Sequence, residues 1–179
     1  MAVGNPMNLL MNIAVYGSIA KALGVPMSFP GSRAAYDALY QVTDARVLAK
    51  AVDWAGSTTA CRGEVYNITN GDYFRWSRIW PRIAQFFDVS PGEPFPLMLE
   101  TMMADKAKLW GEITAEHSLK EYPYEKIVAW KFGDFIFKTE FDNITSTIKA
   151  RQHGFQECID TEDMFIEILQ ELRDQRFIP

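Results

Sequence analysis

The chain has 179 residues and a formal net charge of −5, a length that suits one ordinary domain or part of a larger one. Hydrophobic residues make up 48% and aromatic residues 13%, so the chain can bury a sizeable core and is not expected to be disordered. Lysines and arginines are scattered without runs, which argues against nucleic-acid binding. Cys61 and Cys158 match neither a disulfide framework nor a metal site, which favours free thiols in a reducing, cytoplasmic compartment.

An apolar stretch near the N-terminus, residues 7–23, predicts a soluble helix. It is too short and too polar to span a bilayer, and no basic residue precedes it as in a secretory signal. Asn5 is the expected N-cap, Pro6 the first helical residue and Gly24 the end. The polar face is weak, which predicts that both sides of the helix are covered, by a partner or by another domain.

Three short strands are expected next, at residues 27–29, 39–43 and 63–69. The last of these is the strongest, because it is β-branched and aromatic and ends at a turn signal. Asp44 is expected to cap a helix that runs to about Trp54. Because helices separate the strands, we expect the strands to be parallel. The buried face predicted for that helix consists of Val47, Leu48, Ala51 and Val52.

The rest of the chain is predicted to be helical. A loop at residues 90–96, rich in proline, is the only plausible internal boundary. Lys106 interrupts the apolar stripe of a long predicted helix. The predicted helices span residues 77–87, 97–117, 124–130 and 143–152, and a last helix follows the acidic caps at 160–163.

These elements predict a helix-rich α/β chain that lacks most of its sheet. A parallel strand such as residues 63–69 needs strands on both sides and helices on both faces. The chain offers too few strands to provide them.

Several segments, in their order and spacing, resemble the bacterial members of one family of extended short-chain dehydrogenases/reductases. This is the progesterone 5β-reductase/iridoid synthase-like group, and the resemblance covers the whole chain. The segments are Ala2-Val-Gly-Asn-Pro-Met-Asn8, Phe29-Pro-Gly-Ser32, Thr43-Asp-Ala-Arg-Val-Leu-Ala49, Gly63-Glu-Val-Tyr-Asn-Ile-Thr-Asn-Gly-Asp72 and Phe74-Arg-Trp-Ser-x-Ile-Trp80.

The resemblance implies an oxidoreductase of the enone-reductase type. Members of the family reduce the carbon–carbon double bond of enones with NADPH, using a Rossmann domain with a glycine-rich loop and a catalytic tyrosine near a lysine. The family has both elements before the segment that is residues 4–8 here, and this sequence contains no such glycine loop. The resemblance therefore implies that residues 1–179 are the substrate-binding C-terminal region of an extended short-chain dehydrogenase fold, without the nucleotide-binding region, and that the chain is inactive alone.

The resemblance also implies where ligands bind. Gly4, Asn5 and Met7 match the loop that passes beside the NADPH cofactor in relatives, and Met7 also faces the substrate. Met102, on the long predicted helix, and Phe132, where relatives have an aromatic wall, are the further candidates for binding a small apolar enone.

No catalytic residue and no metal site are predicted. Tyr122 and Lys126 have the spacing of the family's catalytic pair, but Pro123 places them in a turn between helices, where a surface helix start is the better interpretation. Core packing is likewise favoured for Met103 and Trp110.

Two other functions stay open. One is a related sugar-nucleotide epimerase or dehydratase that uses NAD(P), whose pocket would contain more arginine and asparagine for a diphosphate. The other is a non-catalytic helical module that binds an apolar ligand or forms a homo-oligomer through its exposed strand and first helix. The missing N-terminal half of the parent enzyme is the alternative partner for these apolar faces.

Overall fold

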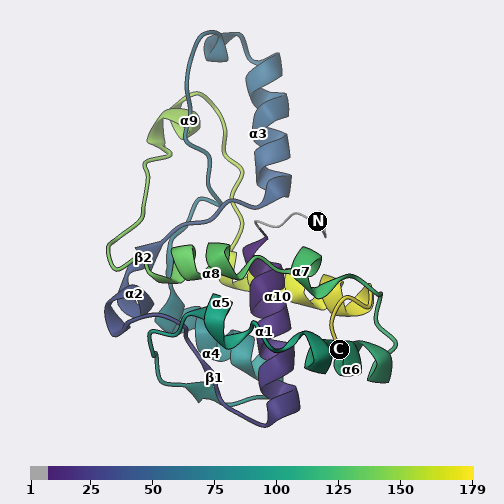
Figure 1. Ribbon diagram of the computed structural model, residues 1–179. Coiled ribbons are helices and arrows are strands. Elements are labelled where there is room, and N and C mark those ends of the chain that lie inside the picture. The colour runs from purple at the N-terminus through teal and green to yellow at the C-terminus, as the bar shows by residue number, and fades with distance from the viewer. Residues whose placement is uncertain (1–7) are drawn as a thin grey trace.

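The computed structural model describes residues 8–179, and Figure 1 shows one helix running through the centre of its lower part. This helix, α1 (Leu9–Leu23), begins after Asn8, whose side chain accepts hydrogen bonds from two amides of the first turn. It ends at Gly24, as predicted, in the left-handed conformation with φ 64°. The helix begins later than predicted; Asn5 and Pro6, the expected cap and first residue, lie outside the described residues.

The central helix is buried on every side, which confirms the covering predicted from its weak polar face. Ten consecutive residues, from Met11 to Ala20, are buried. The cover comes from the chain's own elements α6, α8, α10 and β1, and the expectation that a partner or another domain supplies it was wrong. Asn12 is fully buried, and its side chain exchanges two hydrogen bonds with the backbone of Ala129, at 2.8 and 2.9 Å.

The other elements follow in an order dominated by short helices. The helices are α2 (Arg33–Asp37), α3 (Ala45–Ser57), α4 (Trp76–Phe86), α5 (Leu99–Met102), α6 (Ala107–Glu116), α7 (Tyr124–Ile127), α8 (Trp130–Phe137), α9 (Ile148–Gln152) and α10 (Thr161–Asp174), with a 3-10 turn, η1, at Thr59–Cys61. The strands are β1 (Met27–Ser28), β2 (Leu39–Tyr40), β3 (Phe74–Arg75) and β4 (Pro91–Gly92).

The long helix expected over residues 97–117 is broken in two, so that prediction was wrong. The short helix α5 ends at Met102, and α6 starts only after Lys106, the residue that interrupts the apolar stripe. The Asp134 carboxylate of α8 binds two amides at the start of α5, which fixes the first turn by a contact that is remote in sequence. The last helix, in contrast, is as predicted: Asp160 caps α10 through the amide of Asp163.

The strands form two separate pairs. β1 and β4 are parallel, with Met27 opposite Pro91, although β4 lies within residues 90–96, which were predicted as a loop. β2 and β3 are antiparallel, which contradicts the expectation for strands separated by helices. Each of these strands has only two residues, and β3 is the extended arm that enters α4, so the chain can double back onto β2 without a crossover.

Residues 63–69, the segment predicted as the best strand, form no strand within the part of the chain that the structure describes. Side chains bind this extended segment in place of a ladder: Thr43 Oγ1 donates to the Ile68 carbonyl at 2.9 Å, and Lys149 Nζ donates to the Val65 carbonyl at 3.0 Å. The β-propensity of these residues was predicted correctly. A strand also needs a neighbouring strand, and no described strand pairs with this segment. Val65 is consequently 81% exposed.

Two regions can be separated. The body contains α1 and the elements packed around it, and the upper lobe contains α3, η1, α9 and the segments 62–69 and 153–158 (Figure 1). The body core is aromatic: the Phe29 ring lies 5.3 Å from that of Trp80 and 5.2 Å from that of Phe137. Trp80 is fully buried, and its indole nitrogen donates to the Met27 carbonyl at 2.9 Å.

The upper lobe has a much smaller core. Its fully packed members are Val47, Ala51, Ala150 and Phe155. Half of the buried face predicted for α3 is in fact exposed, because the lobe covers only one side of that helix: Leu48 is 48% exposed and Val52 66%.

Asn70 joins the two regions. It is fully buried; its side-chain oxygen accepts from the Asp44 amide at 2.7 Å, and its side-chain nitrogen donates to Thr161 Oγ1 at 3.0 Å. Asp72 holds the same threonine, accepting from its hydroxyl at 2.6 Å and from its amide at 2.8 Å. The start of α3, the turn after residues 63–69 and the start of α10 are therefore fixed together.

One close approach in the body depends on a glycine. Gly17 lies in the middle of α1, and a Cβ atom there would collide with the ring of Phe87, which follows α4. The Phe87 ring fills the space that a side chain on α1 would need, and only 1% of the residue is exposed. This contact lets α1 and the end of α4 approach closely.

Candidate functional site: a cleft between α5 and α8

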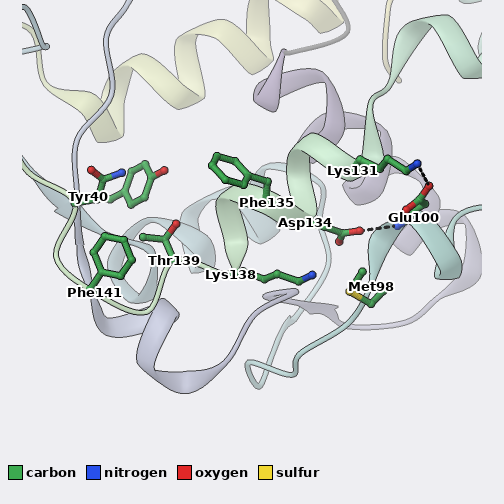
Figure 2. A pocket seen from close by; sticks show the side chains of 10 residues that line it. Tyr40, Met98, Glu100, Lys131, Asp134, Phe135, Lys138, Thr139 and Phe141 are labelled. Carbon is green, nitrogen blue, oxygen red and sulfur yellow. Dashed lines mark hydrogen bonds and ion pairs between the residues drawn. The ribbon is translucent and has the colours of Figure 1, made fainter.

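A cleft of about 550 Å³ lies between α5, α8, β2 and the segment 139–143. Figure 2 shows aromatic side chains at one end and charged side chains at the other. The lining residues are Tyr40, Met98, Glu100, Lys131, Asp134, Phe135, Lys138, Thr139, Phe141 and Asn143.

Helix α8 supplies three of these residues, and Lys138, which directly follows it, continues the same face. Lys131, Asp134, Phe135 and Lys138 follow one another at steps of three, one and three residues, so they lie on one side of the helix. The opposite side, with Gly133 and Phe137, packs into the core. The sequence of α8 thus places charged and aromatic groups together at the surface of the body.

Asp134 connects the two helical walls of the cleft. It is 4% exposed, and its two carboxylate oxygens accept from the amides of Leu99 at 2.7 Å and Glu100 at 3.1 Å. A buried carboxylate needs such donors, and the start of a helix offers them together with a favourable dipole. Asp134 therefore acts as the N-terminal cap of α5 and positions Met98 and Glu100 opposite α8.

The apolar part of the cleft is unusually open. Phe135 is 71% exposed, Phe141 70% and Met98 43%. Large apolar side chains gathered at one exposed place are typical of a binding site rather than of an ordinary surface. The cleft can therefore cover an apolar molecule and remove water from it.

Tyr124, which lies outside the cleft lining, supports the wall that α5 forms. The Tyr124 hydroxyl donates to the Met103 carbonyl at 2.9 Å, just after α5 ends. Burial raises the pKa of Tyr124 to about 12, so the phenol keeps its proton and this hydrogen bond across the physiological range.

Two of the residues predicted to bind ligands, Met102 and Phe132, lie in the described part of the chain. Gly4, Asn5 and Met7 lie outside the described residues. Met102 on α5 and Phe132 on α8 are half-buried and belong to the two helices that form the walls, but neither lines the cleft. Their contact with substrate stays a prediction.

Core packing holds for Met103 and Trp110, which are 2% and 4% exposed. Tyr122 and Lys126 lie at the surface around the start of α7, and the Tyr122 ring lies 5.6 Å from that of Phe177. Neither residue lines the cleft.

The residues that line the cleft were not predicted from the sequence, chiefly Tyr40, Phe135, Lys138 and Phe141. A signal for them existed in α8, because the spacing of its charged and aromatic residues matches one helix face. No comparable signal exists for Tyr40 and Phe141, since the approach of β2 to the segment 139–143 depends on the tertiary fold.

The start of α1 does not fit the phosphate of a nucleotide cofactor. The start of α1 would be the natural place for a phosphate, but the Asn8 side chain already accepts from the amides of Leu10 and Met11, at 3.1 and 3.3 Å. Over residues 8–179, no group of three or more His, Cys, Asp or Glu side chains could hold a metal ion. No described helix is long and apolar enough to span a bilayer.

Comparison with known proteins gives the chain relatives over almost its whole length. It is 30% identical over 177 residues to the (S)-8-oxocitronellyl enol synthase of Antirrhinum majus, and 29% identical over 178 residues to that of Catharanthus roseus. It is 30% identical over 176 residues to the 3-oxo-Delta(4,5)-steroid 5-beta-reductase of Arabidopsis thaliana. Each alignment covers 97% of this chain but only 45% of the relative.

No family model matches the chain. The chain spans less than half the length of the curated relatives it matches. The resemblance indicated by the sequence motifs is nevertheless confirmed: the chain is similar to the progesterone 5β-reductase/iridoid synthase-like proteins and fits the C-terminal part of such a protein.

Proposed function

We propose that the chain supplies the substrate-binding part of an NADPH-dependent oxidoreductase that reduces the carbon–carbon double bond of an enone. The relatives support this assignment by their names, since one is a reductase of 3-oxo-Delta(4,5)-steroids. The observation that carries the proposal is the set of exposed apolar side chains that line the cleft, Met98, Phe135 and Phe141. Such a surface suits a mostly apolar molecule.

In this proposal the chain binds the enone and shields it from water, and it performs no catalytic step. NADPH supplies the hydride in such a reductase, and the start of α1 offers it no phosphate cradle. The aromatic side chains of α8 and the segment 139–143 hold the apolar body of the enone and exclude water from it. NADPH contact through Gly4, Asn5 and Met7 is part of the same proposal.

The composition of the cleft argues against the sugar-nucleotide alternative. Recognition of a diphosphate is typically bidentate and uses arginine. The lining contains two lysines, one of them paired, and no arginine. The cleft therefore favours a substrate with little charge over a nucleotide sugar.

Calorimetric titration of the chain with a neutral 3-oxo-Delta(4,5)-steroid tests the proposal. We expect saturable binding that Phe135→Ala weakens about tenfold, because an aromatic contact of this kind is worth about 1.5 kcal/mol. Tyr73→Ala is the matched control, since Tyr73 is 65% exposed and does not line the cleft. Absence of steroid binding, or equal loss in both variants, would contradict the proposed function.

A parallel titration with NADPH tests whether the chain binds the substrate without binding the cofactor. The chain alone should show no tight binding of NADPH, because the amides at the start of α1 are already occupied. Micromolar affinity would show that these 179 residues hold the cofactor themselves, and the assignment as substrate-binding part would then be wrong.

A further inference from the structure

The Tyr40 side chain reaches the cleft, and its hydroxyl has no hydrogen-bond partner in the described part of the chain. Tyr40 is 7% exposed, and its ring packs against those of Phe74 and Trp76, both at 6.1 Å. The backbone of Tyr40 bridges to Asn143, yet no described residue forms a hydrogen bond with its hydroxyl. The ring is packed in the core while the residue lines the cleft, so its hydroxyl is available to a molecule bound there.

Figure 2 shows the hydroxyl end of Tyr40 pointing toward the side of the cleft where Phe135 lies. A molecule resting on Phe135 and Phe141 would reach it. The hydroxyl can then donate a hydrogen bond to an oxygen of that molecule.

Lys138 is a second donor that lines the cleft; its side chain is exposed and has no acceptor among the described residues. It follows the last residue of α8, and its side chain extends into the cleft toward Met98 (Figure 2). The end of a helix favours a cation at this position. That preference accounts neither for the exposed aromatic residues beside Lys138 nor for its lack of an acceptor. No carboxylate of the described residues lies within ion-pair distance of Lys138.

The other charges of the cleft are compensated. Lys131 pairs with Glu100 at 3.2 Å, and Asp134 is fully used by the start of α5. Lys138 is therefore the cation of the lining that stays available to an anionic group of a bound molecule. A single lysine, with no arginine in the lining, matches one carboxylate better than a phosphate or a diphosphate.

We propose that the cleft selects an enone whose apolar body carries a carboxylate, with the carboxylate bound by Lys138 and a further oxygen by Tyr40. The inference rests on the proposed function, which requires only an apolar enone, and it names the substrate class more closely. Phe135, Phe141 and Met98 cover the apolar body, and Lys138 discriminates the acid from a neutral analogue of the same shape.

The test compares two probes of the same shape, a 3-oxo-Delta(4,5)-steroid with a side-chain carboxylate and its methyl ester, by calorimetric titration of the full chain. At low ionic strength, the acid should bind about fivefold more tightly than the ester, since an exposed charge pair is worth about 1 kcal/mol. Lys138→Gln should remove that advantage and leave the affinity for the ester unchanged. Raising the salt concentration should have the same effect as the substitution.

Two further variants complete the design. Tyr40→Phe keeps the packed ring and should weaken both probes about threefold, because each probe offers an acceptor oxygen. Lys126→Gln, an exposed lysine of α7 outside the cleft, should change neither affinity.

The outcomes separate this inference from the proposed function. Equal affinities for acid and ester, or an unchanged preference in Lys138→Gln, would overturn the carboxylate proposal while leaving an apolar enone site in place. If neither probe binds, both the inference and the proposed function fail. A preference for the acid that disappears only in Lys138→Gln supports both.

Discussion

The body and the upper lobe are built from the same chain but are held together differently. In the body, α1 is buried on all sides and surrounded by aromatic rings in mutual contact. In the upper lobe, α3 is covered on one side only, and much of the contact between segments is polar: Lys50 pairs with Glu157 and Lys149 with Glu64, both at 2.6 Å. Exposed ion pairs contribute little to stability. The lobe should therefore open locally while the body stays folded.

A tryptophan-to-alanine substitution in each region tests this difference, and it has the largest expected effect. Trp80→Ala in the body should lower the free energy of unfolding by about 4 kcal/mol, because it leaves a large cavity in the core and removes a buried hydrogen bond. Trp54→Ala in the lobe removes a half-buried ring that lies 4.9 Å from Tyr66 and 5.2 Å from Phe155.

Urea unfolding and amide hydrogen exchange distinguish the two results. Trp80→Ala should shift the global transition and speed exchange everywhere, whereas Trp54→Ala should speed exchange mainly in α3 and α9. Equal global shifts would mean that the molecule unfolds as one unit, and the contrast between the two regions would be wrong.

Asn70→Ala tests the joint between the regions. It leaves the Asp44 amide and the Thr161 hydroxyl without their buried partner, and we expect a loss of about 2 kcal/mol in the free energy of unfolding. Asn67→Ala, an exposed asparagine three residues earlier with one hydrogen bond to the Ser146 carbonyl, should cost far less. Unfolding of both variants in urea measures the difference, and similar losses would show that Asn70 has no special role.

The smallest expected effect concerns pH. The Arg46 guanidinium, together with its backbone amide, lowers the pKa of the Asp44 carboxyl, the cap of α3. A lowered pKa in the folded state contributes stability above the unfolded value of about 4, and that contribution is lost as the pH falls through the lowered value. Because Arg46 is more than half exposed, we expect less than about 1 kcal/mol.

Asp44→Asn isolates this contribution. The variant should lose less stability than the parent chain between pH 6 and about pH 3, when thermal unfolding is followed at both values. An identical acid dependence in the two proteins would mean that the Asp44–Arg46 pair does not distinguish folded from unfolded chain.

The features that the sequence predicted correctly have local causes. Gly24 ends α1 and Asp160 starts α10, because left-handed glycines and acidic caps act within a few residues of themselves. Local chemistry decides each of these elements, so no knowledge of distant contacts was needed.

The features that the sequence did not predict depend on contacts that are remote along the chain. At the break between α5 and α6, the Tyr124 hydroxyl donates to the Met103 carbonyl, and the start of α5 is held by Asp134 on another helix. Residues 63–69 have the composition of a strand but no neighbouring strand. The cleft could be predicted only in part: the face of α8 is visible in the spacing of Asp134, Phe135 and Lys138, whereas its position beside Tyr40 is not.

Gly17 and Phe87 have a consequence for how this chain can vary. The ring of Phe87 occupies the space that any side chain at position 17 would need. A larger residue at 17 is therefore tolerated only if a smaller one replaces Phe87, and neither single change is neutral. In related sequences the two positions should change together, as a compensating pair: a small residue on the central helix with a large ring after α4, or the reverse.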